Sequence, residues 1–137
     1  MRQFLITLAV IFWASGAVIA QEENSDANLQ ATIQQQIDAF LVDDFATAFS
    51  FASPNIQRRF GNPNIFGSMV RQGYPMVWRP AEVTYLEQEQ VGETTYQRIR
   101  IIDADGDAHW LAYEMIVIED QWRINGVYLI DEPELNV

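Results

Sequence analysis

Acidic residues occur at regular positions in the stretch DADGDAHWLAYE, which runs from Asp103 to Glu114. Acids at its first, third, fifth and twelfth positions match the spacing of a calcium loop that lies between two helices. The glycine needed at the sixth position is missing, because Gly106 is fourth and Ala108 is sixth. If the stretch ends in a strand, Glu114 lies roughly 20 Å from Asp107. The pattern therefore favours a hairpin turn, with Gly106 in left-handed conformation. Weak calcium binding stays open as an alternative, at Asp103, Asp105 and Asp107.

Two residues nearby are candidates for acid–base chemistry. His109 is the only histidine, so a metal site of three histidines is excluded, and a nucleophilic triad would need it in a cleft. Because it directly follows a turn, we expect it at a strand edge in water. Glu114 shares a strand face with apolar residues, where burial would raise its pKa and make it a general base, with Tyr96 or Tyr113 as its partner. We favour the alternative, an ion pair between Glu114 and an arginine of the neighbouring strand, either Arg98 or Arg100.

The stretch RQGYPMVWRP, from residue 71 to residue 80, has the most unusual composition. Its aromatic and guanidinium groups could line the mouth of a pocket and bind an anionic ligand. We favour a structural role, in which Tyr74 and Trp78 fill the core of a rigid connection between helices and sheet. Arg58 and Arg59 are expected to be solvated or paired with acids. No catalytic residue, metal ligand or cofactor is assigned. The candidate ligand-binding residues are Arg71, Tyr74, Trp78, Tyr96, Arg98 and Glu114.

Helical patterns dominate the first half of the chain. Apolar residues at helical spacing predict a helix over 29–41, with Ser25 or Asp26 as its N-cap. A second helix is predicted after a cap at Asp43 or Asp44. A third helix is predicted with Ser53 as its N-cap, Pro54 as its first residue and Gly61 at its end. One or two further helical turns are predicted up to residue 73. The segment MVWRP is predicted to be extended, because residues before proline avoid helical angles.

After Pro80 the apolar period changes from helical to two. Short turns separate four segments with this pattern: AEVTYLEQEQ, TTYQRIRII, AHWLAYEMIVI and QWRINGVYLI. Helices followed by hairpin-linked strands predict an α+β domain, in which N-terminal helices pack on one face of a bent four-stranded antiparallel sheet. The expected boundaries are a single domain over 29–137, preceded by a polar, structureless leader over 21–28.

The N-terminal sequence and the composition indicate the compartment in which the protein is expected and the partners that it can have. Residues 1–20 have the pattern of a cleavable signal peptide: an arginine, then a short apolar run, then small residues before Gln21. The apolar run is shorter than a transmembrane helix requires. We therefore expect a periplasmic or secreted protein without a membrane span after cleavage. The chain has no cysteine, which excludes thiolate chemistry. Its net charge of −11 makes nucleic acid an unsuitable partner.

Two parts of the chain resemble a known family. These are residues 37–78, with DAFLVDDFATAFSFASPNIQRRFG and MVRQGYPMVWRP, and the later YEMIVIEDQWRINGV. They resemble domain-of-unknown-function family 4864, which consists of small exported bacterial proteins and is similar to the cone-shaped superfamily of nuclear transport factor two, also called SnoaL-like. The resemblance implies a bent sheet wrapped around helices, an enclosed pocket, frequent dimers, and inward-pointing Trp122 and Ile124. It implies no activity, since members include enzymes and domains that only bind.

The function expected from these observations is an exported module that binds an unknown small molecule or protein in an internal pocket. The alternative is a small lyase, isomerase or hydrolase that uses Glu114 in that pocket, and a weaker one is a calcium-dependent adhesive surface at the aspartate-rich turn. The third strand is apolar on both faces. Because helices can cover only one of these faces, we also expect a homodimer through the outer face of the sheet.

Overall fold

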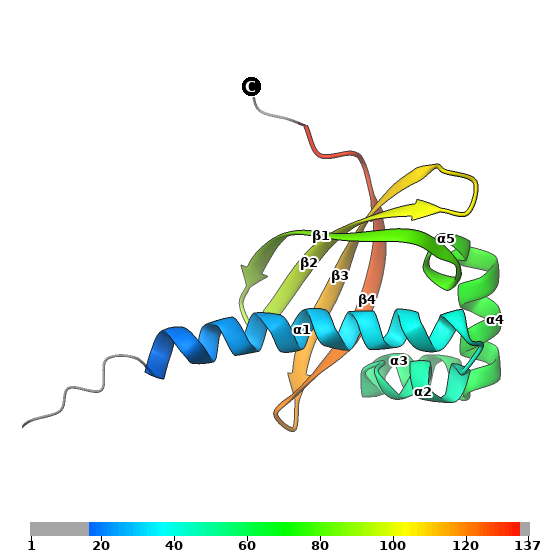
Figure 1. Ribbon diagram of the computed structural model, residues 1–137. Coiled ribbons are helices and arrows are strands. Elements are labelled where there is room, and N and C mark those ends of the chain that lie inside the picture. The colour runs from blue at the N-terminus through cyan, green and yellow to red at the C-terminus, as the bar shows by residue number, and fades with distance from the viewer. Residues whose placement is uncertain (1–16, 135–137) are drawn as a thin grey trace, which may run out of the picture.

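One long helix and one twisted sheet form the two layers of the fold. The computed structural model describes the backbone of residues 17–134 and the side chains from Ser25 onward. Helix α1 (Ala17–Leu41) lies across the sheet, and four shorter helices gather at its C-terminal end (Figure 1). These helices are α2 (Phe45–Ser50), α3 (Pro54–Phe60), α4 (Pro63–Gly73) and α5 (Pro75–Trp78). The strands are β1 (Pro80–Val91), β2 (Thr94–Asp103), β3 (Ala108–Ile118) and β4 (Gln121–Ile130).

The sheet is antiparallel, with its strands in sequence order β1-β2-β3-β4, and this confirms the predicted α+β class. Short turns join the strands. Gly92 and Gly106 take φ values of 63° and 88° in the first two turns, which a glycine adopts at little cost. The register shifts twice in β1 and once in β4, where Glu114 pairs with Gly126 but Met115 pairs with Ile124. Such β-bulges redirect the side chains beside them.

The core lies between α1 and the inner face of the sheet. Residues at helical spacing on α1 and alternate residues on β2 and β3 are almost fully buried, as the periods of the sequence predict. Burial of each leucine or isoleucine contributes about 1.5–3 kcal/mol. Trp122 is partly buried and Ile124 is 4% exposed, so both contribute to this core as expected. The central members are Leu29, Ile33, Ile37 and Phe40 on α1, and Ile99, Ile101, Leu111, Tyr113, Met115 and Ile124 on the strands.

A fully buried glutamine supports the β1 bulge. Gln97 on β2 donates a hydrogen bond of 3.0 Å from Nε2 to the carbonyl of Leu86, which lies where β1 shifts its register. Its Oε1 accepts hydrogen bonds from the amides of Gln30 and Gln88. Because each of its polar atoms has a partner, the cost of burying this side chain is offset.

The connection between α2 and α3 covers part of the outer edge of β4. The Ser53 amide donates to the Ile124 carbonyl at 2.8 Å, and the Ile124 amide donates to the Phe51 carbonyl at 2.9 Å. The Ser53 hydroxyl also accepts from the Ile56 amide, so it caps α3 as predicted, and Gly61 ends that helix at a φ of 82°. These bonds hold the short helices beside the last strand.

Two of the predicted boundaries were wrong. Helix α1 begins at Ala17, so residues 21–28 are helical instead of forming a structureless leader, and Ser25 and Asp26 are not caps. No glycine or proline interrupts residues 17–41, and alanine, glutamine and glutamate favour helix. The segment predicted to be extended contains most of α5, because Pro75 suits a first helical turn. The helix ends before Arg79, which directly precedes Pro80 and leaves the helical region at φ −136° and ψ 68°.

The predicted signal peptide falls mostly outside the described residues, which begin at Ala17. Export therefore stays a prediction. Within the described part of the chain, no helix combines the length and the hydropathy that a membrane crossing requires.

Candidate functional site

A cavity of about 270 Å³ lies between the helices and the last strand. Its walls come from α1, α3, α4, α5 and β4, together with the residue before the α3 cap. Most of the lining is apolar, and aromatic rings that contact one another form one side, with the centroids of Phe60 and Phe66 separated by 5.9 Å. The main apolar residues of the wall are Phe40, Ile56, Phe60, Phe66, Met69 and Val70.

Two polar side chains in the wall are held by backbone groups. Gln36 is 3% exposed, and its Nε2 donates to the carbonyl of Ala48 at 3.0 Å. The hydroxyl of Tyr74 donates to the carbonyl of Val127 at 3.0 Å, just past the β4 bulge. The first bond connects α1 to α2 and the second connects the junction of α4 and α5 to β4, so both fix the shape of the cavity and give these polar groups partners.

Asn125 lies at the β4 bulge and lines the cavity. Its Oδ1 accepts a hydrogen bond of 2.7 Å from the Ser53 hydroxyl, and its Nδ2 donates to Oε2 of Glu114 at 2.9 Å. The bulge therefore places one amide between the α3 cap and a carboxylate of the neighbouring strand. This network sets the orientation of the asparagine before any ligand is present.

The mouth of the cavity carries exposed groups. Tyr128 is 50% exposed, and Arg59 on α3 is exposed as well. Arg59 pairs with no carboxylate in the described part of the chain, whereas three other arginines do. Among the residues that the structure describes, it is the only charged side chain in the lining. The cavity thus has an apolar interior, a few oriented polar groups and one cation at its opening.

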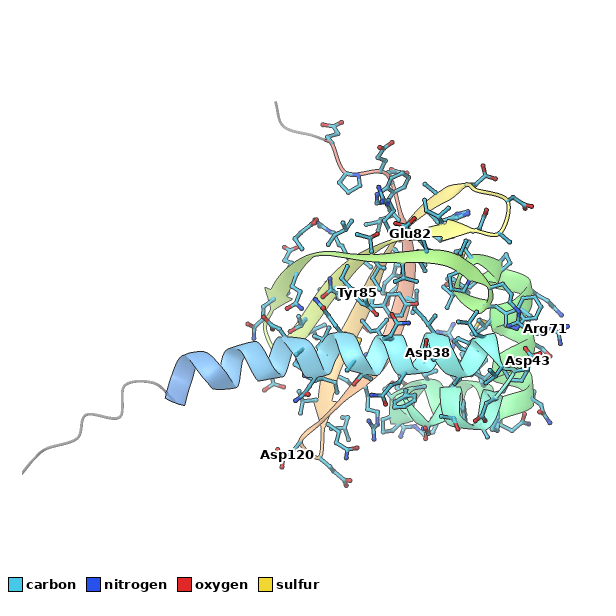
Figure 2. All side chains as sticks on the ribbon, viewed as in Figure 1. Asp38, Asp43, Arg71, Glu82, Tyr85 and Asp120 are labelled. Atoms are coloured by element: carbon cyan, nitrogen blue, oxygen red, sulfur yellow. The ribbon has the colours of Figure 1, made fainter. Side chains whose placement is uncertain are left out.

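The predicted ligand-binding residues lie in three different places, and only Tyr74 lines the cavity. Arg71 and Trp78 lie at the helical end of the molecule, where the guanidinium carbon of Arg71 is 5.0 Å from the centroid of the Trp78 ring. Arg79 lies 3.9 Å from the same centroid and forms an ion pair of 2.9 Å with Asp43. Figure 2 shows Arg71 and Asp43 close together at this end. The Trp78 indole and then Arg79 donate to the Asp43 carboxylate, and these bonds lower its pKa.

Tyr96, Arg98 and Glu114 lie on the outer face of the sheet. The expected ion pair between Glu114 and an arginine was wrong. Tyr96 lies directly opposite Glu114 and donates to its Oε1 at 3.1 Å, which raises the pKa of Tyr96. Arg98 instead reaches toward β1, where it pairs with Glu87 at 2.8 Å. The register of the strands therefore decides which partner each charged group receives.

Tyr113, the second proposed partner of Glu114, lies on the inner face of β3. Adjacent residues of a strand point to opposite faces, so the two side chains cannot act together. Tyr113 is fully buried, and its hydroxyl has no hydrogen-bond partner among the described residues. Desolvation raises the pKa of this phenol.

The aspartate-rich stretch forms the predicted hairpin turn. Oδ1 of Asp103 accepts from the amides of Asp105 at 2.9 Å and Asp107 at 3.0 Å, while Oδ2 lies 2.7 Å from Nε2 of His109. The bond with His109 is the main cause of the lowered pKa of Asp103. Both oxygens of Asp103 thus bind groups of the turn and of the strand that follows it. The described residues contain no group of three potential metal ligands.

Sequence reasoning missed Arg59, Asn125 and Tyr128 as residues of the cavity. Arg59 had been assigned to solvent or to an acid partner, and Asn125 depends on a bulge that alternation does not reveal. The distribution of charged residues in the sequence could have pointed to Arg59. None of the 19 acidic residues lies between Phe45 and Arg79, and this segment holds four of the eight arginines.

The solved structures that are similar to this chain include two bacterial proteins. One is an NTF-2 like protein of unknown function from Burkholderia xenovorans LB400, with 13% identity and a TM-score of 0.48, over 80% of this chain and 88% of that one. The other is a SEC-C motif containing protein from Rhodopseudomonas palustris, with 13% identity and a TM-score of 0.48, over 69% of this chain and 72% of that one. Among curated proteins, none matches the sequence.

A family model covers nearly the whole chain. The domain of unknown function DUF4864 matches residues 22–137, which include both stretches that carried the resemblance in the sequence. The family expected from those stretches is therefore confirmed, and the chain belongs to the DUF4864 family.

Proposed function

We propose that this protein is an exported binding domain that holds a small, mainly apolar molecule in its internal cavity. The observation that carries the proposal is the lining, which combines aromatic and aliphatic walls with the few oriented polar groups of Gln36, Tyr74 and Asn125. Ligand sites in proteins have this composition. The volume of about 270 Å³ lies just below the usual range of about 300–1,000 Å³, which suits a compact ligand.

Binding fits the cavity better than catalysis does. Among the described residues, the lining contains no carboxylate, histidine, serine or cysteine. Glu114, on which the enzymatic alternative depends, lies on the outer face of the sheet, and its carboxylate is held by Tyr96 and Asn125. A lyase or hydrolase in this cavity would have to rely on tyrosine alone for proton transfer. The polar groups that are present can orient a ligand.

A cavity-filling variant tests the proposal. Ile56→Trp places a large ring from α3 into the cavity, and Ile65→Trp is its control because Ile65 is 54% exposed on α4 outside the lining. Titration of ¹⁵N-labelled protein with octanoate and with 1-octanol, followed by NMR, should give saturable shifts at cavity residues. We expect Ile56→Trp to weaken binding of either probe at least about tenfold, while Ile65→Trp binds as the wild type does. Wild-type protein that binds neither probe, or equal binding by both variants, would disprove the proposal.

Two related expectations stay predictions. Cleavage after residue 20 should appear as a mature N-terminus at Gln21 in mass spectra of the exported protein. Pairing of two copies through the outer sheet face should appear as a dimer mass in light scattering, and a monomer at high concentration would exclude it.

A further inference from the structure

The charges of this acidic protein are segregated along the chain. The segment from Phe45 to Arg79 contains four arginines and no acidic residue, although the whole chain has 19 acids and a net charge of −11. This segment forms the helices α2, α3, α4 and α5, which lie together beside the C-terminal end of α1 (Figure 1). Three of these helices, α3, α4 and α5, supply part of the cavity wall, so this part of the wall comes from a segment whose charged residues are all arginines, in a protein that is strongly anionic as a whole.

Arg59 is the group of this segment that can reach a ligand in the cavity. Arg79 is already paired with Asp43, and Arg71 stacks on Trp78 away from the lining. Arg59 lines the cavity and has no carboxylate partner in the part of the chain that the structure describes. Its planar guanidinium can bind a carboxylate through two parallel hydrogen bonds.

The net charge of the protein does not prevent an anion from binding here. Charges farther away than the Debye length, about 10 Å at 0.1 M salt, are largely screened. The acid linked most directly to the lining is Glu114, and its two oxygens already accept hydrogen bonds from Tyr96 and Asn125. The charge of the nearby Arg59 therefore favours a ligand with a negative charge.

We propose that the ligand is a small amphipathic monoanion, with an apolar body inside the cavity and a carboxylate-type head bound by Arg59 at the mouth. This inference rests on the proposed function, because it requires that the cavity holds a ligand. It adds the chemical class of that ligand and the residue that selects it. An alcohol with the same body lacks the charge, and an ammonium head would be repelled by the guanidinium.

Three probes with one chain length and different heads test the inference: octanoate, 1-octanol and octylammonium. Each is titrated at pH 7.5 into the full chain, into Arg59→Gln and into Arg58→Gln, and dissociation constants are measured by NMR or calorimetry. Arg58 is the matched control, because it is the adjacent arginine of α3 and lies outside the lining. We expect octanoate to bind the wild type about tenfold more tightly than 1-octanol, as hydrogen bonds to a charged group require. This preference should disappear in Arg59→Gln and persist in Arg58→Gln.

The outcomes separate the two proposals. If 1-octanol binds as tightly as octanoate, or if both arginine variants lose the preference equally, the cavity binds ligands but the inference about the anion is wrong. Wild-type protein that binds octylammonium more tightly than octanoate would also disprove the inference. If no probe binds the wild type, both the proposed function and the inference fail.

Discussion

Removal of one hydroxyl from the core should stabilise this protein. Tyr113 is fully buried on the inner face of β3, and its hydroxyl has no hydrogen-bond partner among the described residues. Burial of an unsatisfied polar group costs about 1–3 kcal/mol relative to water. Tyr113→Phe removes that cost and loses only the packing contacts of one oxygen atom, each worth about 0.1–0.2 kcal/mol. We therefore expect the free energy of unfolding to rise by about 1 kcal/mol.

Tyr85→Phe is the matched control. The Tyr85 side chain points from β1 toward α1 (Figure 2), and its hydroxyl lies 3.0 Å from Oε1 of Gln34 and 3.3 Å from the carbonyl of Gln30. The same chemical change should here lower the free energy of unfolding by about 1 kcal/mol, because it removes a hydrogen bond. The two variants are thus predicted to change the free energy of unfolding in opposite directions.

Urea unfolding followed by tryptophan fluorescence measures both effects by linear extrapolation. Thermal unfolding should show the midpoint of Tyr113→Phe about 4 °C above the wild type. If Tyr113→Phe destabilises the protein as much as Tyr85→Phe does, the buried hydroxyl makes a stabilising bond in solution. The reasoning about its unsatisfied state would then be wrong.

Two further predictions concern a close contact and a turn. Gly67→Ala should cost about 1–3 kcal/mol of stability in urea unfolding, because its Cβ would lie 2.6 Å from a phenylalanine ring of α2. Gly73→Ala on the same helix meets nothing within 4 Å and should be neutral or slightly stabilising, so an equal loss in both variants would refute the packing argument. The hydrogen bond from His109 lowers the pKa of Asp103 in the folded state. The ionised Asp103 carboxylate therefore stabilises the fold above about pH 4, and this stabilisation is lost as the pH falls through the lowered pKa. Thermal midpoints between pH 2 and 6 should therefore vary less in Asp103→Asn than in the control Asp105→Asn, and identical pH profiles would contradict this assignment.

Local patterns were sufficient to predict most of the fold. The change to a period of two after Pro80 predicted all four strands and, away from the bulges, the face on which side chains lie, because alternation is a property of the single strand. Ser53 and Gly61 predicted both ends of α3, since a cap and a left-handed glycine act on neighbouring backbone groups. The aspartate-rich hairpin followed from the position of Gly106 for the same reason.

The cavity could not be predicted in the same way, because it combines segments that are far apart in the chain. Asn125 reaches it only through a bulge, and a bulge depends on how two strands pair. The partner of Glu114 depended on register, which placed Tyr96 opposite it and Arg98 toward β1. The absence of acids around Arg59 was visible in the sequence and is the signal that pointed to the mouth of the cavity.

The two outer edges of the sheet have a consequence for behaviour in concentrated solution. An open strand edge is a template on which further chains can add and form fibres. The edge of β4 is blocked at Ile124 by the connection between α2 and α3, and β1 changes register twice and carries exposed glutamates. Neither edge offers a long, regular row of free amides and carbonyls. The protein should accordingly resist polymerisation through its strands, even where crowding brings many copies together.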